Sequence, residues 1–411
     1  MILKSITLLK SKIYLLFLLF FIGGVKLSFA QPELSSWILN PGTAKGYAGI
    51  LSNVQKIQYS NNFVYITAAC IPGYDIGPWK GNPNTPANQN FQFKITRKPI
   101  VNSGNPTAVG LGHIGVFSNG VSIFNTSDAQ SYLNQKVWNR NAYYWEGPGF
   151  DTCLGHPAQN GEYHHHVSPK CLYNHNDSIH HSPIIGYAFD GFPIYGAFAY
   201  ANTNGQGIIR LMRSSFKLKS MVTRINGPAI DQSYPLGCYL EDYEFVDGSG
   251  DLDKRNGRFC ITPDYPKGTY CYFATLDQTL APSFPYVPYT SYYGVVSPGN
   301  IGPGSGHNTP TETVITYTGS TSIIEKPYET LLHIWPNPSN MGWIIAGLSA
   351  KTHSTVFCSI YNLQGQKVYH TVINVDPLNP NIHIPVLQVG LYWIELCDEK
   401  DLVFRSRIVA E

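Results

Sequence analysis

The sequence predicts a mainly β protein, in which a larger β-rich domain is followed by a small immunoglobulin-like β-sandwich. Short runs that alternate apolar and polar residues dominate the chain, as in NNFVYITA at 62–69. Glycine and proline are frequent, with 38 and 29 copies, so turns should separate these runs. Charged residues make up only 13%, whereas tyrosine has 28 copies, which favours strands over long helices.

Several elements of the first domain are predicted from local pattern. A strand should cover 62–69, and a second β-like run at 115–124 contains an Asn-Gly turn. Two further runs at 184–189 and 192–198 flank an Asp-Gly pair, which predicts a hairpin. Residues 128–138 favour a helix, because a capping residue precedes moderately helix-forming side chains.

Residues 1–30 have the pattern of a secretory signal peptide. Three lysines precede a short apolar run at 13–22, and small residues surround Ala30. The run is short for a membrane span, and an uncleaved anchor is the alternative. Because no later segment reaches spanning length, we expect an exported chain that does not span a membrane.

The composition divides the remaining chain into four parts. An N-terminal extension at 31–57 precedes the larger domain at 58–295, and a compact strand-rich unit occupies 329–411. Between these two domains, residues 296–328 are rich in Gly, Pro, Ser and Thr, which predicts a linker. The formal net charge is +2 and no basic run occurs, so the sequence gives no argument for nucleic-acid binding.

The even number of cysteines suits a disulfide-bonded exported protein. Cys153 and Cys171 flank the richest histidine region, and we expect them to form a disulfide that closes a loop of about 19 residues. A bond between Cys358 and Cys397 is a weaker prediction, because only their shared domain supports it. The remaining cysteines are Cys70, Cys238, Cys260 and Cys271.

Histidines are concentrated in one short stretch. Seven of the 13 lie between residues 156 and 181, where background usage would place fewer than about one. Imidazole is the commonest neutral metal ligand and titrates near physiological pH, so a functional site is expected here. The seven are His156, His164, His165, His166, His175, His180 and His181.

His164 and His166 have the spacing of two ligands on one face of a strand. Residues at i and i+2 lie about 7 Å apart along a strand and point the same way, whereas His165 points the other way. Two such imidazoles can converge on one metal ion, and His156 and His181 are candidates to complete the set. Zn or Cu suits these ligands better than Mg. The alternative is that the imidazoles only hydrogen-bond to backbone groups or tyrosines.

Two neighbouring residues are candidates to orient the ligand histidines. Tyr163 directly precedes His164, and Asp190 is a carboxylate near the imidazoles in sequence. Asp190 needs no function if it only forms the turn before Gly191, and both interpretations stay open. No Gly-x-Ser-x-Gly and no His-Glu-x-x-His occurs, so the sequence supports neither a serine-hydrolase elbow nor a zincin helix, and the catalytic residues are unknown.

The histidine-rich core resembles a known family. YHHH at 163–166, GHP at 155–157 and HSPIIGYAFDGFPIYG at 181–196 resemble the YHYH domain family, which is named for a Tyr-His-Tyr-His motif. Here His165 stands at the third position. GDLDKRNGRF at 250–259 also looks like the family, and the similarity covers about 58–295. No established reaction comes with this resemblance, so it implies a secreted domain and not an activity.

Four further motifs occur in order near the C-terminus. They are WPNP at 335–338, IYNLQGQKV at 360–368, GLYWI at 390–394 and RSRIV at 405–409. Together they resemble the C-terminal sorting domain of type IX secretion. This resemblance implies that the type IX secretion machinery is a partner and that the protein is secreted or attached to the cell surface.

Two classes of function remain open. In the first, the histidines bind a divalent transition metal, and the protein catalyses metal-assisted hydrolysis or oxidation. In the second, the protein is a non-catalytic module that binds glycans or surfaces through aromatic residues, and the histidines are structural. The aromatic candidates are Trp138, Tyr143, Tyr144 and Trp145. Metal content and glycan binding of one preparation separate the two classes.

Overall fold

The computed structural model describes residues 31–411 except 41, 303, 319–332, 347–354, 363–365, 375–381 and 398–401. The chain forms two compact units, residues 1–317 and 318–411. The signal peptide predicted at 1–30 lies outside the described residues. In the part of the chain that is described, no helix is long and apolar enough to cross a membrane.

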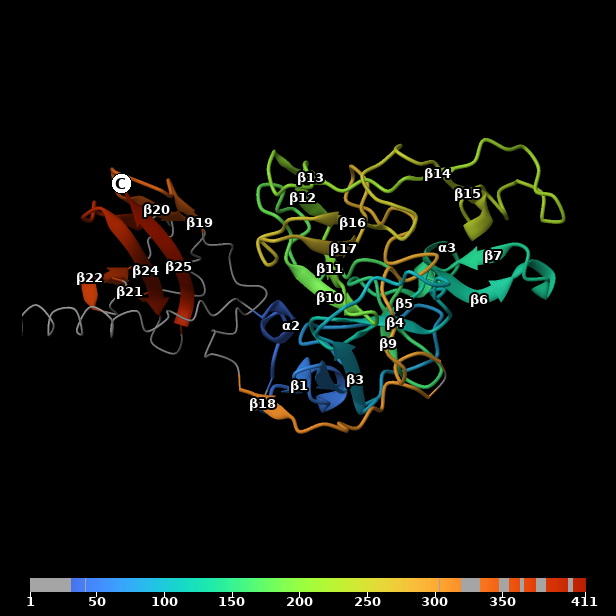
Figure 1. Ribbon diagram of the computed structural model, residues 1–411, viewed down its shortest axis with the longest axis horizontal. Helices are drawn as coiled ribbons and strands as arrows, with labels where there is room; N and C mark the ends of the chain where they lie inside the picture. Colours follow the sequence, from blue (N-terminus) through green and yellow to red (C-terminus); the bar gives the residue numbers. More distant parts are fainter. Residues whose placement is uncertain are drawn as a thin grey trace, which may run out of the picture. The chain divides into compact units, whose positions relative to one another are not determined.

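An eight-stranded sheet forms the centre of the first unit (Figure 1). Its strands are β4 (His113–Phe117), β5 (Ser122–Phe124), β8 (His156–Pro157), β9 (Tyr163–His165), β10 (Ile184–Ala188), β11 (Pro193–Tyr195), β16 (Gly257–Cys260) and β17 (Thr269–Phe273). Their order is β16-β17-β11-β10-β4-β5-β9-β8. Most neighbours are antiparallel, but β5 pairs with β9 and β11 with β17 in parallel. Strands β9 and β8 therefore lie at one edge of this sheet.

Both hairpins predicted from Asn-Gly and Asp-Gly pairs are present. β4 and β5 pair antiparallel around Gly120, and β10 and β11 pair antiparallel around Gly191. Both glycines have positive φ, 79° and 89°, which side chains with a Cβ disfavour. A Cβ on Gly191 would also lie 2.5 Å from Thr96 Cγ2. These turns require glycine, which is why the two pairs predict them.

A second sheet of the same unit has four strands. It contains β1 (Val54–Tyr59), β2 (Phe63–Ala68), β3 (Phe91–Thr96) and β18 (Ile315–Tyr317), in the order β18-β1-β2-β3. β2 confirms the strand predicted at 62–69. Three two-stranded sheets complete the unit: β6 (Ser127–Ser131) with β7 (Asn139–Asn141), β12 (Phe198–Tyr200) with β13 (Ile209–Leu211), and β14 (Phe216–Leu218) with β15 (Tyr243–Phe245).

Strand β18 comes from the segment at 296–328 whose composition predicts a linker. Tyr317 pairs with Ile57 of β1, and the Asn300 side chain hydrogen-bonds both backbone groups of Lys94. Backbone and amide hydrogen bonds thus hold a segment that has few apolar side chains. The first unit extends to Tyr317, beyond the boundary that the composition indicates.

The helix predicted over 128–138 is wrong. This segment instead forms β6, a 3-10 turn at Tyr132–Asn134 and the approach to β7. Positive φ angles exclude an α-helix at four of its residues, which are Ala129, Leu133, Asn134 and Lys136. Helix propensity is a weak guide where tertiary contacts favour another conformation. The described α-helices are the one-turn helices α2 (Pro32–Ser35) and α3 (Ala142–Trp145).

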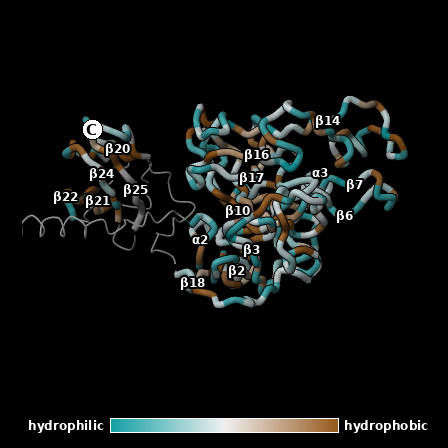
Figure 2. Tube along the Cα trace, in the orientation of Figure 1, coloured by the Kyte–Doolittle hydropathy of each residue, from teal (hydrophilic) through white to brown (hydrophobic). Residues whose placement is uncertain are grey.

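The central sheet is buried on both faces. All residues of β4 and of β10 are buried, and hydrophobic residues gather around β10 (Figure 2). The two strands approach closely at Gly115 and Gly186, where a Cβ would meet a carbonyl oxygen of the other strand at 2.6 and 2.5 Å. Close packing of this kind gives the edge strands β9 and β8 a rigid support.

The second unit contains two antiparallel sheets around one core. The first has the order β19 (His333–Trp335), β20 (Trp343–Ala346), β23 (Ile382–Ile384), and the second β22 (Lys367–Asn374), β21 (Thr355–Asn362), β24 (Gly390–Cys397), β25 (Leu402–Ala410). Both sheets contribute buried residues to the shared core. The mainly β fold class is confirmed, and the immunoglobulin-like strand order stays a prediction. Cys358 is a free, buried thiol, so the disulfide predicted between it and Cys397 is wrong.

Candidate metal centre

Two short strands bring three histidines to one edge of the central sheet. β8 pairs antiparallel with β9, and His156 faces His164 in this register. β9 in turn pairs with β5, where Ser122 faces His164. Because side chains alternate along an extended chain, His164 and His166 point to the same face. All three imidazoles therefore meet on one side of the sheet edge.

A fourth group comes from a separate element. Helix α3 begins after Asn141, whose side chain accepts a hydrogen bond from Tyr143 N, and ends at Trp145, directly before Glu146. Glu146 Oε2 lies 2.8 Å from His166 Nε2 and 3.3 Å from His156 Nε2. The carboxylate thus closes the open side of the three imidazoles.

The four side chains form a ring of close contacts. His164 Nε2 is 3.0 Å from His156 Nε2 and 3.1 Å from His166 Nε2. One nitrogen from each histidine and one Glu146 oxygen all lie within 4.8 Å of one another. Among the described residues, no other set of three or more His, Cys, Asp or Glu side chains has this spacing.

Hydrogen bonds on the far side of two rings determine which nitrogen faces the centre. His164 Nδ1 lies 3.0 Å from the Glu162 carbonyl oxygen, and His166 Nδ1 contacts the Asn125 carbonyl oxygen. A carbonyl only accepts, so each Nδ1 donates and carries the hydrogen. In the neutral rings both Nε2 atoms then present lone pairs, which face each other at 3.1 Å.

Aromatic rings cover most of the group. Phe124 stacks on His164 with ring centroids 3.8 Å apart, and Phe150 packs against His156 at 4.8 Å. His164 is 3% exposed, whereas the Glu146 side chain is 28% exposed. The Glu146 side chain is therefore the most exposed member of the group, although its Oε2 atom is buried.

Burial and neighbouring charge set the protonation of the group. Burial, together with His156 and His166, lowers the pKa of His164 well below its usual range. Burial by itself raises the pKa of Glu146, but the contacts with His156 and His166 outweigh burial and hold this pKa well below its usual range. At neutral pH the group therefore combines a charged carboxylate with a neutral central imidazole.

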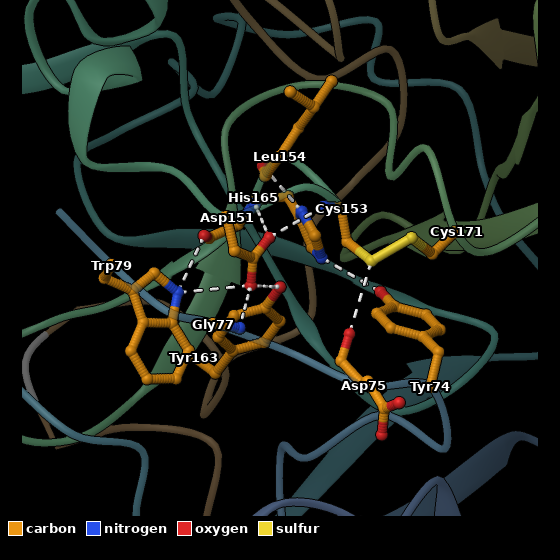
Figure 3. The surroundings of a disulfide bond; sticks show 11 residues. Tyr74, Asp75, Gly77, Trp79, Asp151, Cys153, Leu154, Tyr163, His165 and Cys171 are labelled. Atoms are coloured by element: carbon orange, nitrogen blue, oxygen red, sulfur yellow. Dashed lines mark hydrogen bonds between the residues drawn. A yellow bond between two sulfur atoms is a disulfide. The ribbon is translucent and has the colours of Figure 1, made fainter.

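The other face of β9 carries a hydrogen-bond network (Figure 3). Tyr163 Oη donates to Asp151 Oδ2 at 2.8 Å, and His165 Nε2 lies 3.1 Å from Tyr74 Oη. Asp151 also accepts from four further donors, which are Gly77 N, Trp79 Nε1, Cys153 N and Gly155 N. The Asp151 carboxylate thus fixes the turn that leads into β8.

The disulfide predicted between Cys153 and Cys171 is present, with a sequence separation of 18 (Figure 3). It ties the turn before β8 to the segment after β9. Gly155 lies in the same turn, where a Cβ would overlap the Tyr163 hydroxyl and the His165 ring. The turn is therefore held tightly against the back of β9.

The group contains three of the four histidines predicted as ligands, namely His156, His164 and His166. His181 lies elsewhere, with its ring centroid 4.9 Å from that of Tyr195. Glu146, which the sequence analysis did not single out, supplies the fourth group. No motif marks Glu146, because it follows a one-turn helix without a periodic pattern.

The two residues predicted to orient the ligands do not face the group. Tyr163 lies on the opposite face of β9, with its hydroxyl on Asp151. Asp190 is buried at its hairpin turn, where it accepts from Tyr272 Oη at 2.7 Å and from Gly294 N at 2.8 Å. Burial raises the pKa of Asp190 above its usual value. Asp190 thus serves the fold of the hairpin.

Of the aromatic residues considered for glycan binding, one is buried, two are half-buried and one is exposed. Trp138 is 8% exposed and donates through Nε1 to the Ile225 carbonyl oxygen. Trp145 donates in the same way to the Cys238 carbonyl oxygen. Of the four candidates only Tyr144 is exposed, at 40%. The four residues therefore do not form one continuous exposed aromatic surface.

Comparisons with known proteins assign both parts of the chain. Residues 92–285 match the YHYH protein family. Residues 333–411 match a secretion system C-terminal sorting domain. The chain is a YHYH domain protein with a C-terminal sorting domain. No curated protein and no solved structure matches it.

The YHYH domain holds the whole group of three histidines and Glu146. The two histidines of its motif are His164 and His166, and the residue between them, His165, lies on the other face of β9. The sorting domain directs export by the type IX secretion system to the cell surface or the medium, so that system handles the chain during export.

Proposed function

We propose that the YHYH domain of this exported protein binds one transition metal ion through Glu146, His156, His164 and His166. The observation that carries the proposal is the convergence of three imidazole nitrogens and one carboxylate oxygen within 4.8 Å. Imidazole and carboxylate are common ligands of Zn and Cu. Metal binding is the function that this group of side chains supports best.

A cation accounts for the group better than hydrogen bonds do. Nδ1 of His164 and Nδ1 of His166 both donate to carbonyl oxygens, so neither neutral ring has a hydrogen left to donate from Nε2. A group held only by hydrogen bonds requires an additional proton between buried rings. One metal ion would take the lone pairs of His164 Nε2, His166 Nε2 and Glu146 Oε2 together, and the charge of Glu146 would offset part of the charge of the ion. His156 Nδ1 lies 3.4 Å from the Asn82 amide nitrogen, which can only donate, so His156 would release a proton from Nε2 on binding the ion.

The distances between the four ligand atoms favour an ion that prefers tetragonal coordination over one that prefers tetrahedral coordination. Neighbouring ligand atoms around the ring are 2.8, 3.1, 3.0 and 3.3 Å apart. Across the ring, the distance between the Glu146 carboxylate oxygen and the His164 ring nitrogen is more than 4.0 Å and no more than 4.8 Å. Bonds of about 2.0–2.1 Å place all ligands of a tetrahedral ion about 3.3 Å apart, but those of a square ion about 2.9 Å apart along the sides and about 4.1 Å across. Cu(II) has this preference, so we propose Cu(II) rather than Zn.

Burial restricts the chemistry that such an ion can support. Phe124 and Phe150 cover the imidazoles, and Glu146 is the most exposed of the four side chains. Glu146, His156, His164 and His166 would together hold the ion, which would supply redox chemistry at a largely covered site. This arrangement suits oxidation of a small molecule better than hydrolysis of a polymer chain, which needs an open cleft.

Titration of metal-free protein tests the proposal. Cu(II) should bind with one ion per chain and a tetragonal electron paramagnetic resonance spectrum, and more tightly than Zn(II). His166→Ala should abolish this binding, whereas the matched control His180→Ala should not, because His180 is exposed and pairs with Asp177. Equal binding by the two variants contradicts the metal site. A stoichiometric Zn(II) site that binds Cu(II) more weakly overturns only the choice of metal.

A further inference from the structure

A second set of side chains, separate from the metal centre, has the order of a nucleophile, a base and an acid. His113 begins β4, and its Nε2 lies 2.8 Å from the Ser305 hydroxyl oxygen. Its Nδ1 lies 3.1 Å from Glu162 Oε1. A hydroxyl within hydrogen-bond reach of an imidazole that a carboxylate orients is the arrangement of an activated serine.

The base and the acid are shielded from water. His113 is 7% exposed and Glu162 is 5% exposed. Four phenylalanine rings surround the imidazole edge-to-face, which are Phe91, Phe93, Phe124 and Phe189. Because the carboxylate is an acceptor, His113 Nδ1 carries the hydrogen and donates it to Glu162. In the neutral ring Nε2 then presents its lone pair to Ser305.

Ser305 lies at the surface end of this set. It is half-buried between Gly304 and Gly306, which place no side chain beside the hydroxyl and have positive φ of 70° and 85°. Its single hydroxyl hydrogen has two acceptors in reach, the Gly302 carbonyl oxygen at 2.6 Å and His113 Nε2 at 2.8 Å. Rotation of the hydroxyl transfers this hydrogen bond from the carbonyl to the imidazole.

We propose that Ser305, His113 and Glu162 form a second, hydrolytic site that takes carboxylic esters. Ser305 is the only one of the three residues that is not buried, so an ester carbonyl reaches its hydroxyl from solvent. Ser305 Oγ bonds to the acyl carbon while its proton passes to His113 Nε2, and the carbon–oxygen bond to the alcohol breaks as His113 returns the proton to the departing alcohol. Water then attacks the acyl-serine, with its proton passing through His113 to Ser305 Oγ, and releases the acid. Glu162 orients the imidazole and stabilises its protonated form.

A fluorophosphonate probe, which phosphonylates activated serines, tests the site in the secreted protein. We expect one adduct per chain, assigned to Ser305 by peptide mapping and absent from Ser305→Ala. His113→Gln should slow adduct formation by roughly 100-fold or more, because the base is lost. The matched control is Ser249→Ala, since Ser249 is also half-buried but donates to the Ser215 carbonyl oxygen. This control should label at the rate of the unmodified chain.

A further variant and chelator treatment separate a reactive serine from a purely structural contact. Glu162→Gln should also slow labelling, and thermal unfolding of each variant shows whether it is folded. The rate of fluorophosphonate labelling should not change after chelator treatment, because the proposed site does not use the metal. Loss of labelling on chelation would show that the site depends on the metal. Absence of an adduct at Ser305 in the folded, unmodified chain, or an equal rate in folded His113→Gln, overturns the proposal. The three residues then only fasten the segment around Ser305 to β4.

Discussion

His156 and His164 face each other across strands β8 and β9, with their Nε2 atoms 3.0 Å apart. The strand pairing sets this distance, because opposed residues on antiparallel strands have Cβ atoms about 4.5–5.5 Å apart. In the proposed function the metal ion lies between these nitrogens. A change that loosens β8 from β9 should therefore weaken metal binding, even when it touches no ligand.

Removal of the Cys153–Cys171 disulfide should lower stability and metal affinity together. The bond closes a segment with a separation of 18 that contains both β8 and β9. The chain-entropy model assigns such a closure about 3 kcal/mol. Denaturant unfolding of Cys153→Ser/Cys171→Ser should find a loss of this size, and metal titration should find weaker binding. Lower stability with unchanged affinity would show that the bond supports the fold but not the ligands.

Asp190→Ala should destabilise the YHYH domain and leave metal binding intact. Asp190 accepts hydrogen bonds from the Tyr272 hydroxyl and the Gly294 backbone, and its loss leaves both buried donors without an acceptor. The expected cost is about 3 kcal/mol, measured by urea unfolding. Asp277→Ala, at an exposed turn, is the control and should cost far less. Weaker metal binding by folded Asp190→Ala would instead support a role in orienting a ligand.

Stability should fall as the pH drops from about 6.5 towards 4, in part through His175. Burial lowers the pKa of His175 to about 4 from its usual 6.5. Above pH 6.5 the His175 ring is neutral in both the folded and the unfolded chain, so folding is not penalised by its protonation. Between these values the unfolded chain binds a proton that the folded chain excludes, which favours unfolding by up to about 3 kcal/mol.

His175→Gln should remove this part of the pH dependence. The measurement is denaturant unfolding of metal-free protein at several pH values, for the variant and the unmodified chain. His180→Gln is the control, because His180 is an exposed histidine paired with Asp177. The same slope in His175→Gln as in the unmodified chain would mean that the folded protein accommodates the proton on His175.

Truncation after residue 317 and truncation after residue 295 should differ in stability. The shorter form loses β18, in which Tyr317 pairs with Ile57, and the Asn300 hydrogen bonds to Lys94. Its melting temperature should therefore lie several degrees below that of the longer form. Equal melting temperatures would favour the boundary at 295 that the composition indicates.

Both truncated forms lack the sorting domain. In a host with type IX secretion, cell fractionation should find both in the periplasm and the complete chain at the surface or in the medium. The form that ends at 317 should bind metal as the complete chain does, because all four proposed ligands lie in residues 92–285. Its appearance in the medium would contradict the export role of the sorting domain.

Strand alternation made part of the proposed metal centre predictable. The i, i+2 spacing predicts that His164 and His166 share a face and that His165 points the other way, and the structure has this arrangement. The same rule places Tyr163 with His165, away from the ligands, and its hydroxyl contacts Asp151. Spacing within one strand therefore determines direction, because the backbone geometry is fixed.

Closeness in sequence did not predict which other residues lie near the histidines. His181 precedes β10, which β4 and β5 separate from β9 in the sheet. Glu146 follows a one-turn helix whose position depends on tertiary packing. Ser305 meets His113 across a separation of 192 residues. Contacts between irregular segments leave no periodic pattern, so local rules do not reveal them.

The metal content of the natively secreted protein, purified without chelator or added metal, can be measured by elemental analysis. We expect one transition metal ion per chain, with copper in excess of zinc. His165→Gln should retain the ion, because His165 contacts Tyr74 and Leu154 on the other face of β9, whereas His164→Ala should lose it. Background metal in the folded, unmodified chain, or full stoichiometry in His164→Ala, would contradict a metal site at these residues.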